Sequence, residues 1–171
     1  RLLRANNVYN AKINNLEIQF VKKNRVKENQ VLQNDDIVIC MASGSKSLAG
    51  KSAIFKINDN YAYTFGSFMG CFRTDTNVAF SEYIAFNFQT ENYRLYISNL
   101  LSGSSINNLK PSDIETIEIP FPPLQEQKAI AQILSDMDSE IEALQQKFEK
   151  YKLIKEGMME KLLTGKVRLN E

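Results

Sequence analysis

Residues 122–165 read PPLQEQKAIAQILSDMDSEIEALQQKFEKYKLIKEGMMEKLLTG, and their pattern predicts the longest element of the chain. From Ile130 onward its apolar residues recur at alternating steps of four and three, the spacing of a coiled-coil heptad, and only Lys155 interrupts the series. Two prolines open the stretch and Thr-Gly closes it, as is typical of the two ends of a helix. The spacing therefore predicts one helix over residues 124–163, about 60 Å long at 1.5 Å per residue.

This predicted helix carries an apolar stripe that a lone helix would leave in water. The stripe must therefore pack against another long helix, from the same family of polypeptides or from a partner chain. We expect nine residues to form that interface, namely Ile130, Leu134, Met137, Ile141, Leu144, Phe148, Tyr151, Met158 and Leu162.

The residues before the prolines are richer in Asn, Ser, aromatic and β-branched side chains. Short apolar runs bounded by turn residues predict strands within 31–42, 52–57, 61–72 and 114–119. Apolar spacings of three and four predict one or two helices within 80–101. Aromatics that nearly alternate along the third run are expected to lie in the core; they are Tyr61, Tyr63, Phe65 and Phe68.

We therefore expect an α+β fold in three parts: a mixed, β-rich domain over residues 1–122, the long helix over 123–163 and a tail over 164–171. The first part carries 13 basic and 11 acidic side chains, and the remainder carries 8 and 9. The chain begins at Arg1, within what reads as structured sequence, so we expect a fragment that starts inside a larger domain.

Composition excludes several classes of function. The 171 residues carry 21 basic and 20 acidic side chains, so no overall cationic field binds nucleic acid by charge alone. The absence of histidine removes Ser-His-Asp and Cys-His nucleophiles and most zinc sites. Cys40 and Cys71 are expected to be reduced, buried thiols of a cytosolic protein. No apolar run approaches the roughly 18 residues of a membrane helix.

Two polar loops are candidate binding elements. Residues 43–51 combine glycines, hydroxyls and two lysines, and residues 102–110 combine Ser, Asn and Lys. Such groups suit hydrogen bonds to base edges and phosphates, but they also suit an ordinary solvated turn, and local sequence leaves the two interpretations of the first loop nearly even.

Catalysis by this chain has weaker support. Asp113 with Glu126 and Lys128 can be aligned with the Asp…Glu-x-Lys pattern of metal-dependent nucleases, but that pattern needs Glu and Lys on a strand beside the Asp. Here they follow two prolines in a first helical turn, where an acidic side chain favours the helix N-terminus. A metal site is not expected, and no glycine-rich loop for S-adenosylmethionine follows a strand.

Four segments together resemble the specificity (S) subunit of type I restriction–modification systems. Leu3-Arg-Ala-Asn-Asn-Val8 resembles the L-R-x-x-N-I/V segment of its target recognition domains. Leu32-Gln-Asn-Asp-Asp-Ile37 resembles L-x-x-G-D-I/L, with Asp35 where glycine is usual. Residues 109–127 resemble the boundary I-x-I-P-x-P-P-x-x-E-Q, and residues 160–168 resemble the ending L-L-T-G-K-x-R. Because the resemblance starts at Leu2-Leu3-Arg4, within the family's target recognition domain, we expect the N-terminal part of that domain to lie outside these residues.

The resemblance implies a non-catalytic subunit of bacterial or archaeal cytoplasm that recognises one half of a bipartite site in double-stranded DNA. It implies that the long helix pairs in an antiparallel coiled coil, with a second copy or a second half, and docks the modification (methyltransferase) subunits. S-adenosylmethionine, ATP and Mg²⁺ would then belong to those subunits and to the restriction subunit, and this chain would hold no cofactor. The alternatives are a coiled-coil adaptor that binds no DNA and, with less support, the metal-dependent nuclease.

On this interpretation, loop side chains contact base edges and phosphates. The residues expected at the DNA are Ser43, Ser45, Lys46, Lys51, Arg73, Ser104, Asn107, Asn108 and Lys110.

Overall fold

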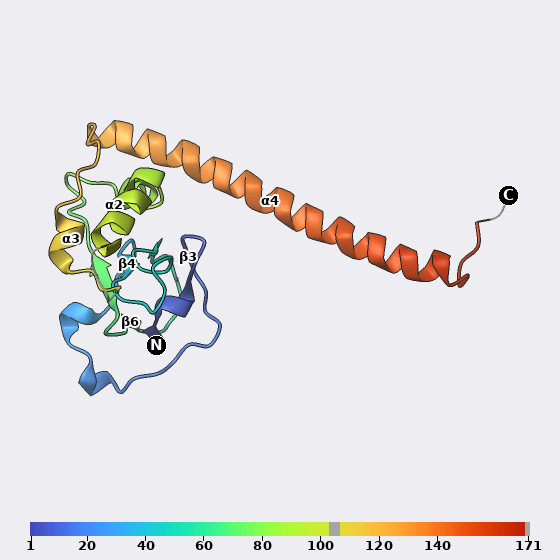
Figure 1. Cartoon of the computed structure of the whole chain (residues 1–171), viewed down its shortest axis with the longest axis horizontal. Helices are drawn as coiled ribbons and strands as arrows, with labels where there is room; N and C mark the ends of the chain where they lie inside the picture. Colours follow the sequence, from blue (N-terminus) through green and yellow to red (C-terminus); the bar gives the residue numbers. More distant parts are fainter. Residues whose placement is uncertain (103–106, 170–171) are drawn as a thin grey trace. The chain divides into compact units, whose positions relative to one another are not determined.

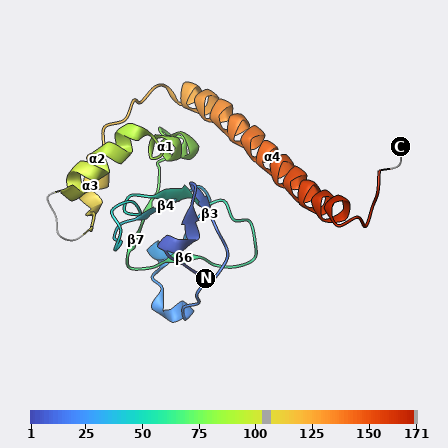
Figure 2. The ribbon, with the colours of Figure 1, turned by 45° about the vertical axis from the view of Figure 1, so that its right-hand side comes forward.

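A computed structural model describes residues 1–102 and 107–169 (Figures 1 and 2). It divides into two compact units, residues 1–129 and residues 130–171. The strands are β1 (Leu2–Leu3), β2 (Val8–Tyr9), β3 (Lys12–Ile13), β4 (Ile37–Cys40), β5 (Ser52–Ile54), β6 (Thr64–Phe65) and β7 (Met69–Phe72). The α-helices are α1 (Ser81–Asn87), α2 (Glu91–Ser102), α3 (Pro111–Glu115) and α4 (Leu124–Leu163), and three short 3-10 helices lie at Ala5–Asn7, Lys23–Arg25 and Glu28–Gln30. The predicted α+β class is confirmed.

A three-stranded antiparallel sheet with the order β5-β4-β7 forms the centre of the first unit. All four residues of β4 are buried, because this strand pairs on both edges: Val38 lies opposite Ala53 of β5 and Cys71 of β7. An apolar strand between two partners is the expected outcome for a short run bounded by polar turns. The sheet therefore fixes where the 43–50 loop, which connects β4 to β5, leaves the core.

Two smaller ladders complete the core. β1 pairs in parallel with β6, and β2 and β3 form a hairpin whose turn residues Asn10 and Ala11 have positive φ. Asn7, from the first motif of the sequence, is fully buried. Its amide donates to the carbonyls of Asn14 and Leu16, and its Oδ1 accepts from the Arg4 N–H at 2.9 Å. This side chain therefore ties the chain before and after the hairpin together.

Residues 80–102 form two helices, as one of the two sequence interpretations predicts. Buried Tyr93, Ile97 and Leu101 repeat every four residues and so lie on one face of α2. Both views place α2 on the side of β4 opposite to β6 (Figures 1 and 2). The buried face of α2 thereby lies over the end of the 43–50 loop, where Tyr93 contacts Gly50.

The strand predicted over residues 114–119 is wrong. A short helix, α3, covers Pro111–Glu115, and the residues after it form no strand. Pro111 suits a first helical position, and Asp113 accepts a 2.7 Å hydrogen bond from the Lys110 N–H. Capping thus outweighs the β-branched run, in which only Ile114 is buried.

The aromatic run is core only in part. Tyr63 is buried and Phe65 half-buried, but Tyr61 is 59% exposed and Phe68 is 67% exposed. Tyr61 instead lies beneath the Arg1 guanidinium, 3.6 Å from ring centroid to Cζ. Phe68 lies in the turn before β7, where its carbonyl accepts from the backbone of the segment that follows β4. The two exposed aromatics, Tyr61 and Phe68, therefore both lie outside strands β6 and β7.

The long helix α4 begins and ends where the sequence predicts. Gly165, with φ of 72°, follows its last turn, and the Gly165 N–H donates to the Leu162 carbonyl at 3.2 Å. Among the described residues, no helix is both long enough and apolar enough to cross a membrane.

Candidate nucleic-acid interface

Hydrogen bonds within the 43–50 loop, several of them to serine hydroxyls, stabilise its conformation. The Ser45 N–H donates to Ser43 Oγ at 3.2 Å, and the hydroxyls of Ser45 and Ser47 lie 2.8 Å apart. The Leu48 N–H donates back to the Ser45 carbonyl. Lys46 sits between these groups with its side chain exposed. The loop thus presents a hydroxyl group and an ammonium group on a closed backbone turn.

Residues 107–110, the described end of the second predicted loop, lie against the first loop. Ala42 and Asn108 form an antiparallel bridge, and the Leu109 N–H donates to the Met41 carbonyl at 2.7 Å. The Ser43 N–H donates to the Asn107 carbonyl at 3.1 Å, and Asn107 Nδ2 donates to the Gly44 carbonyl at 3.3 Å. Two segments about 60 residues apart in sequence therefore form one polar surface.

This surface, which we call the paired-loop surface, contains Ser43, Ser45, Lys46, Asn107 and Asn108. Lys110 follows directly as the N-cap residue of α3 and is exposed. Lys51 is half-buried and directly follows the first loop. Burial raises the pKa of the Cys40 thiol, and the hydrogen bond to Ala42 and the charge of Lys51 offset part of that rise. Ser104, the remaining loop residue predicted to contact DNA, lies outside the described residues.

Arg73 differs from the other predicted contacts. Its Nε and Nη2 donate to the two carboxylate oxygens of Asp36, each at 2.7 Å, and Nη2 also lies 3.2 Å from the Val31 carbonyl. Asp36 is 1% exposed, and the ion pair raises the pKa of Arg73. Burial, together with the Asp36 charge, raises the pKa of Cys71 to about 12. Arg73 therefore neutralises a buried carboxylate, and we leave it out of the paired-loop surface.

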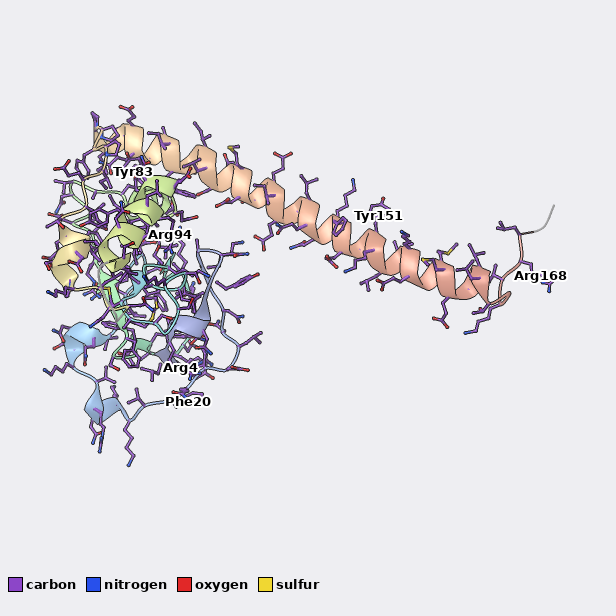
Figure 3. All side chains as sticks on the ribbon, viewed as in Figure 1. Arg4, Phe20, Tyr83, Arg94, Tyr151 and Arg168 are labelled. Carbon is purple, nitrogen blue, oxygen red and sulfur yellow. The ribbon has the colours of Figure 1, made fainter. Side chains whose placement is uncertain are left out.

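Two side chains that sequence reasoning missed hold the end of the first loop. Tyr93 Oη donates to the Gly50 carbonyl at 2.7 Å, and Arg94 donates to the carbonyls of Ala49 and Ser47 at 2.9 and 3.2 Å. Arg94 projects from α2 (Figure 3). Periodicity predicts that Tyr93 is buried, but no local pattern predicts these backbone acceptors.

Asp113 and Glu126 have structural positions. Asp113 caps α3 through the Lys110 N–H, and Glu126 lies in the first turn of α4. Within residues 1–102 and 107–169, no three His, Cys, Asp or Glu side chains gather in a way that would hold a metal ion. The geometry offers the nuclease interpretation no support.

The first turn of α4 is fixed by a buried glutamine. Gln127 is fully buried; its Oε1 accepts from the Phe80 N–H at 2.9 Å, and its Nε2 donates to the carbonyls of Val78 and Pro122. Tyr83 Oη donates to the Pro120 carbonyl at 2.8 Å. The boundary segment around the prolines is therefore held to the start of α1.

Beyond Ala129, α4 exposes its apolar stripe, which we call the α4 seam. Met137, Leu144 and Phe148 are 56%, 57% and 66% exposed. Side chains project from the helix along its whole length, including Tyr151 (Figure 3). Ile130, Leu134 and Leu162 are half-buried, whereas Ile141, Tyr151 and Met158 are exposed like the first three. The seam has the composition and spacing of a helix interface, and within the described part of the second unit α4 is the only helix.

Comparison with known proteins identifies the class. Residues 2–150 match the family described as the type I restriction modification DNA specificity domain. Since the match covers most of the 171 residues, the chain belongs to this family. The resemblance drawn from the four sequence segments is confirmed.

Particular relatives support this assignment. The chain is 40% identical over 166 residues to the specificity subunit of the type I restriction enzyme EcoKI of Escherichia coli K12, and 37% identical to that of StySPI of Salmonella potsdam. Each alignment covers 97% of this chain and 35% of the relative, so the chain spans about a third of their length. The MjaVIII specificity subunit of Methanocaldococcus jannaschii is 41% identical over 69 residues, which is 40% of this chain and 16% of that protein.

A solved structure shares the fold. It is described as "Structural basis underlying complex assembly and conformational transition of the type I R-M system", and its chain superposes with a TM-score of 0.54 at 20% identity. The match covers 77% of this chain and 31% of that one.

Proposed function

We propose that this chain recognises one half of a bipartite site in double-stranded DNA, as part of a type I restriction–modification complex. The observation that carries the proposal is the meeting of two polar loops, where Ser43 and Gly44 hydrogen-bond to Asn107. Family membership supplies the context, and the paired-loop surface supplies donors and acceptors of the kinds that bind base edges.

The chemistry of the surface suggests a division of labour. Ser45 and Asn108 are exposed neutral side chains that both donate and accept, so they suit base edges in a groove. Lys46 and Lys110 are exposed cations that suit phosphates and would position the protein without selecting a sequence. With only two more basic than acidic side chains in residues 1–122, binding by the chain alone should be weak.

On this proposal the chain is not itself catalytic. The modification subunits would bring S-adenosylmethionine and methyl transfer, and the restriction subunit would bring ATP-dependent cleavage. This chain would contribute sequence recognition and, through α4, docking of the modification subunits and pairing with a second long helix.

The charge distribution of α4 favours antiparallel pairing. Residues 124–143 have a net charge of −4, and residues 144–163 have a net charge of +2. A parallel pair would place like charges together, whereas an antiparallel pair places the acidic half of one helix beside the basic half of the other. Pairing of this kind also covers the seam, which water otherwise contacts.

One antiparallel register of two copies uses the whole seam. With Phe148 opposite Leu144 of a second copy, Leu162 meets Ile130, Met158 meets Leu134 and Tyr151 meets Ile141.

Lys155, the one polar core position, then lies opposite Met137, which is flanked by Asp136 and Asp138. A lysine at a core position favours one register, because other registers leave its charge without an acidic neighbour. The same logic applies if the partner is a corresponding helix in a longer subunit.

Charge reversal in the first loop tests the DNA-binding proposal. We expect the double variant Lys46→Glu, Lys51→Glu, assembled with modification subunits, to bind duplex DNA about tenfold more weakly, because the proposed phosphate contact of Lys46 and the positive charge at the end of the same loop both become repulsive. The matched control is Lys22→Glu, Lys27→Glu, which reverses two exposed charges outside the loop. A coiled-coil adaptor that binds no DNA would show the same behaviour in both double variants, and that result would contradict the proposal.

A further inference from the structure

We propose that Tyr93 and Arg94 of α2 are positioning residues that hold the 43–50 loop in its DNA-recognising conformation. The inference rests on the proposed function, because it concerns how the same loop is prepared for recognition. Neither residue needs to touch DNA for this role.

The two side chains bind three backbone carbonyls in the second half of the loop. Arg94 Nη2 donates to the Ser47 carbonyl at 3.2 Å and Nη1 to the Ala49 carbonyl at 2.9 Å. Tyr93 Oη donates to the Gly50 carbonyl at 2.7 Å. Backbone acceptors bound by side chains have their conformation restrained without any change in the loop's own side chains. The second half of the loop is therefore fixed from α2.

The first half of the loop is fixed from a different element. Asn107 accepts from the Ser43 N–H and donates to the Gly44 carbonyl. Between these two sets of contacts lie Ser45 and Lys46, which are exposed. The loop is thus held at both ends, and its apex carries the groups proposed to meet DNA.

The close approach of α2 is a specific feature of the packing. Gly50 has φ of +77°, and a Cβ there would lie 3.0 Å from the side chain of Ile97. The Tyr93 ring stacks on Phe88, with centroids 5.1 Å apart and an interplanar angle of 23°. Both features fix the helix that carries the tyrosine and arginine, so displacement of the loop requires breaking hydrogen bonds to a rigid support.

A positioning role differs from phosphate contact in a measurable way. A side chain that binds phosphate releases counterions, so its loss lowers the salt dependence of binding by about 0.9 in the slope of log K against log salt. Loss of a side chain bound to backbone carbonyls leaves that slope unchanged. It should instead reduce the preference for one DNA sequence over another, because an unrestrained loop pays an ordering cost on binding.

The test uses the 171-residue chain with its modification subunits, and a duplex that this wild-type complex selects from a randomised pool. Binding to that duplex and to a scrambled duplex is measured over a range of salt concentrations. The variants are Arg94→Met, Arg94→Lys and Tyr93→Phe. Lys46→Met serves as the phosphate-contact reference, and Arg25→Met serves as the control for loss of an exposed arginine.

We expect Arg94→Met to reduce discrimination between the two duplexes about tenfold, as for loss of hydrogen bonds from a charged donor, with an unchanged salt slope. Arg94→Lys should recover part of the loss, Tyr93→Phe should show a smaller loss, and Arg25→Met should behave as wild type. Thermal melting identifies any variant that fails to fold. If Arg94→Met does not fold, Tyr93→Phe, which removes only one oxygen atom, still tests the positioning role.

Two results would overturn the inference while leaving the proposed function intact. One is that Arg94→Met and Tyr93→Phe both discriminate between the selected and the scrambled duplex as strongly as the wild-type complex does. The other is a fall in salt slope for Arg94→Met equal to that for Lys46→Met, which would make Arg94 a phosphate contact. Selection of no preferred duplex by the wild-type complex would instead contradict the proposed function itself.

Discussion

The Phe80 backbone N–H donates a 2.9 Å hydrogen bond to the side-chain oxygen of Gln127, 47 residues later. The amide nitrogen of the same glutamine donates to the carbonyls of Val78 and Pro122. One fully buried side chain therefore joins the segment before α1, the proline boundary and the first turn of α4. The start of the long helix is therefore held by the hydrogen bonds of a buried glutamine side chain.

Replacement of Gln127 should destabilise the unit formed by residues 1–129. Gln127→Leu keeps the approximate volume but removes hydrogen bonds to three part-buried backbone groups, so we expect a loss of about 1–2 kcal/mol in the free energy of unfolding. Chemical denaturation measures it. Gln125→Leu, at an exposed position in the same turn, is the control; equal midpoints for the two variants would contradict this role of Gln127.

A second stability prediction concerns Asp35, which stands where the family's segment usually has glycine. Its φ is 69°, in the left-handed region that costs an L-residue about 1–2 kcal/mol. Asp35→Gly should therefore leave stability unchanged or raise it by up to about 1 kcal/mol, since the greater freedom of unfolded glycine offsets part of the gain. Asp35→Ala should lower stability. If alanine proved more stable than glycine at this position, the left-handed turn would not be the determining feature.

Self-association or partner docking should depend on the α4 seam. Leu144→Asp places a charge at the centre of the proposed interface, and we expect helix pairing to weaken by more than about 100-fold. Leu153→Asp introduces the same charge on the same helix, at a 67% exposed residue outside the seam. Mass measured in solution and binding of modification subunits report the effect. Unchanged behaviour of Leu144→Asp on both measures would refute the seam assignment.

The direction of pairing can be measured separately from its strength. In a pair with Phe148 opposite Leu144, spin labels on Ser135→Cys of two copies should lie about 33 Å apart along the axis, at 1.5 Å per residue. A Cys71→Ser background removes the less buried of the two native thiols. An in-register parallel pair would bring the two labels to the same height along the axis, giving a clearly shorter distance.

Local patterns made α4 predictable. Its heptad spacing, its preceding prolines and Gly165 all lie in or next to the helix, and no distant contact was needed to find its ends. The buried strand β4 was predictable for the same reason. The strand expected over residues 114–119 failed because the capping contact at Asp113, which is also local, favours a helical turn instead.

The candidate site depended on contacts that no local pattern encodes. The sequence indicated each polar loop separately, but their meeting depends on the bridge between Ala42 and Asn108. The sequence around Arg73 does not distinguish it from a surface arginine, whereas the fold places it against buried Asp36. Tyr93 and Arg94 act on backbone carbonyls more than 40 residues away, so their role follows only from the packed structure.

Selection from a randomised DNA pool measures whether the paired-loop surface recognises a DNA sequence. The wild-type chain, assembled with modification subunits, should enrich a bipartite motif. The double variant Ser45→Ala, Asn108→Ala should relax preference at some positions of one half-site, because lost base contacts typically cost about 1–3 kcal/mol per base pair. Enrichment of no motif by the wild-type complex, or an identical motif with the double variant, would contradict recognition of DNA by the paired-loop surface.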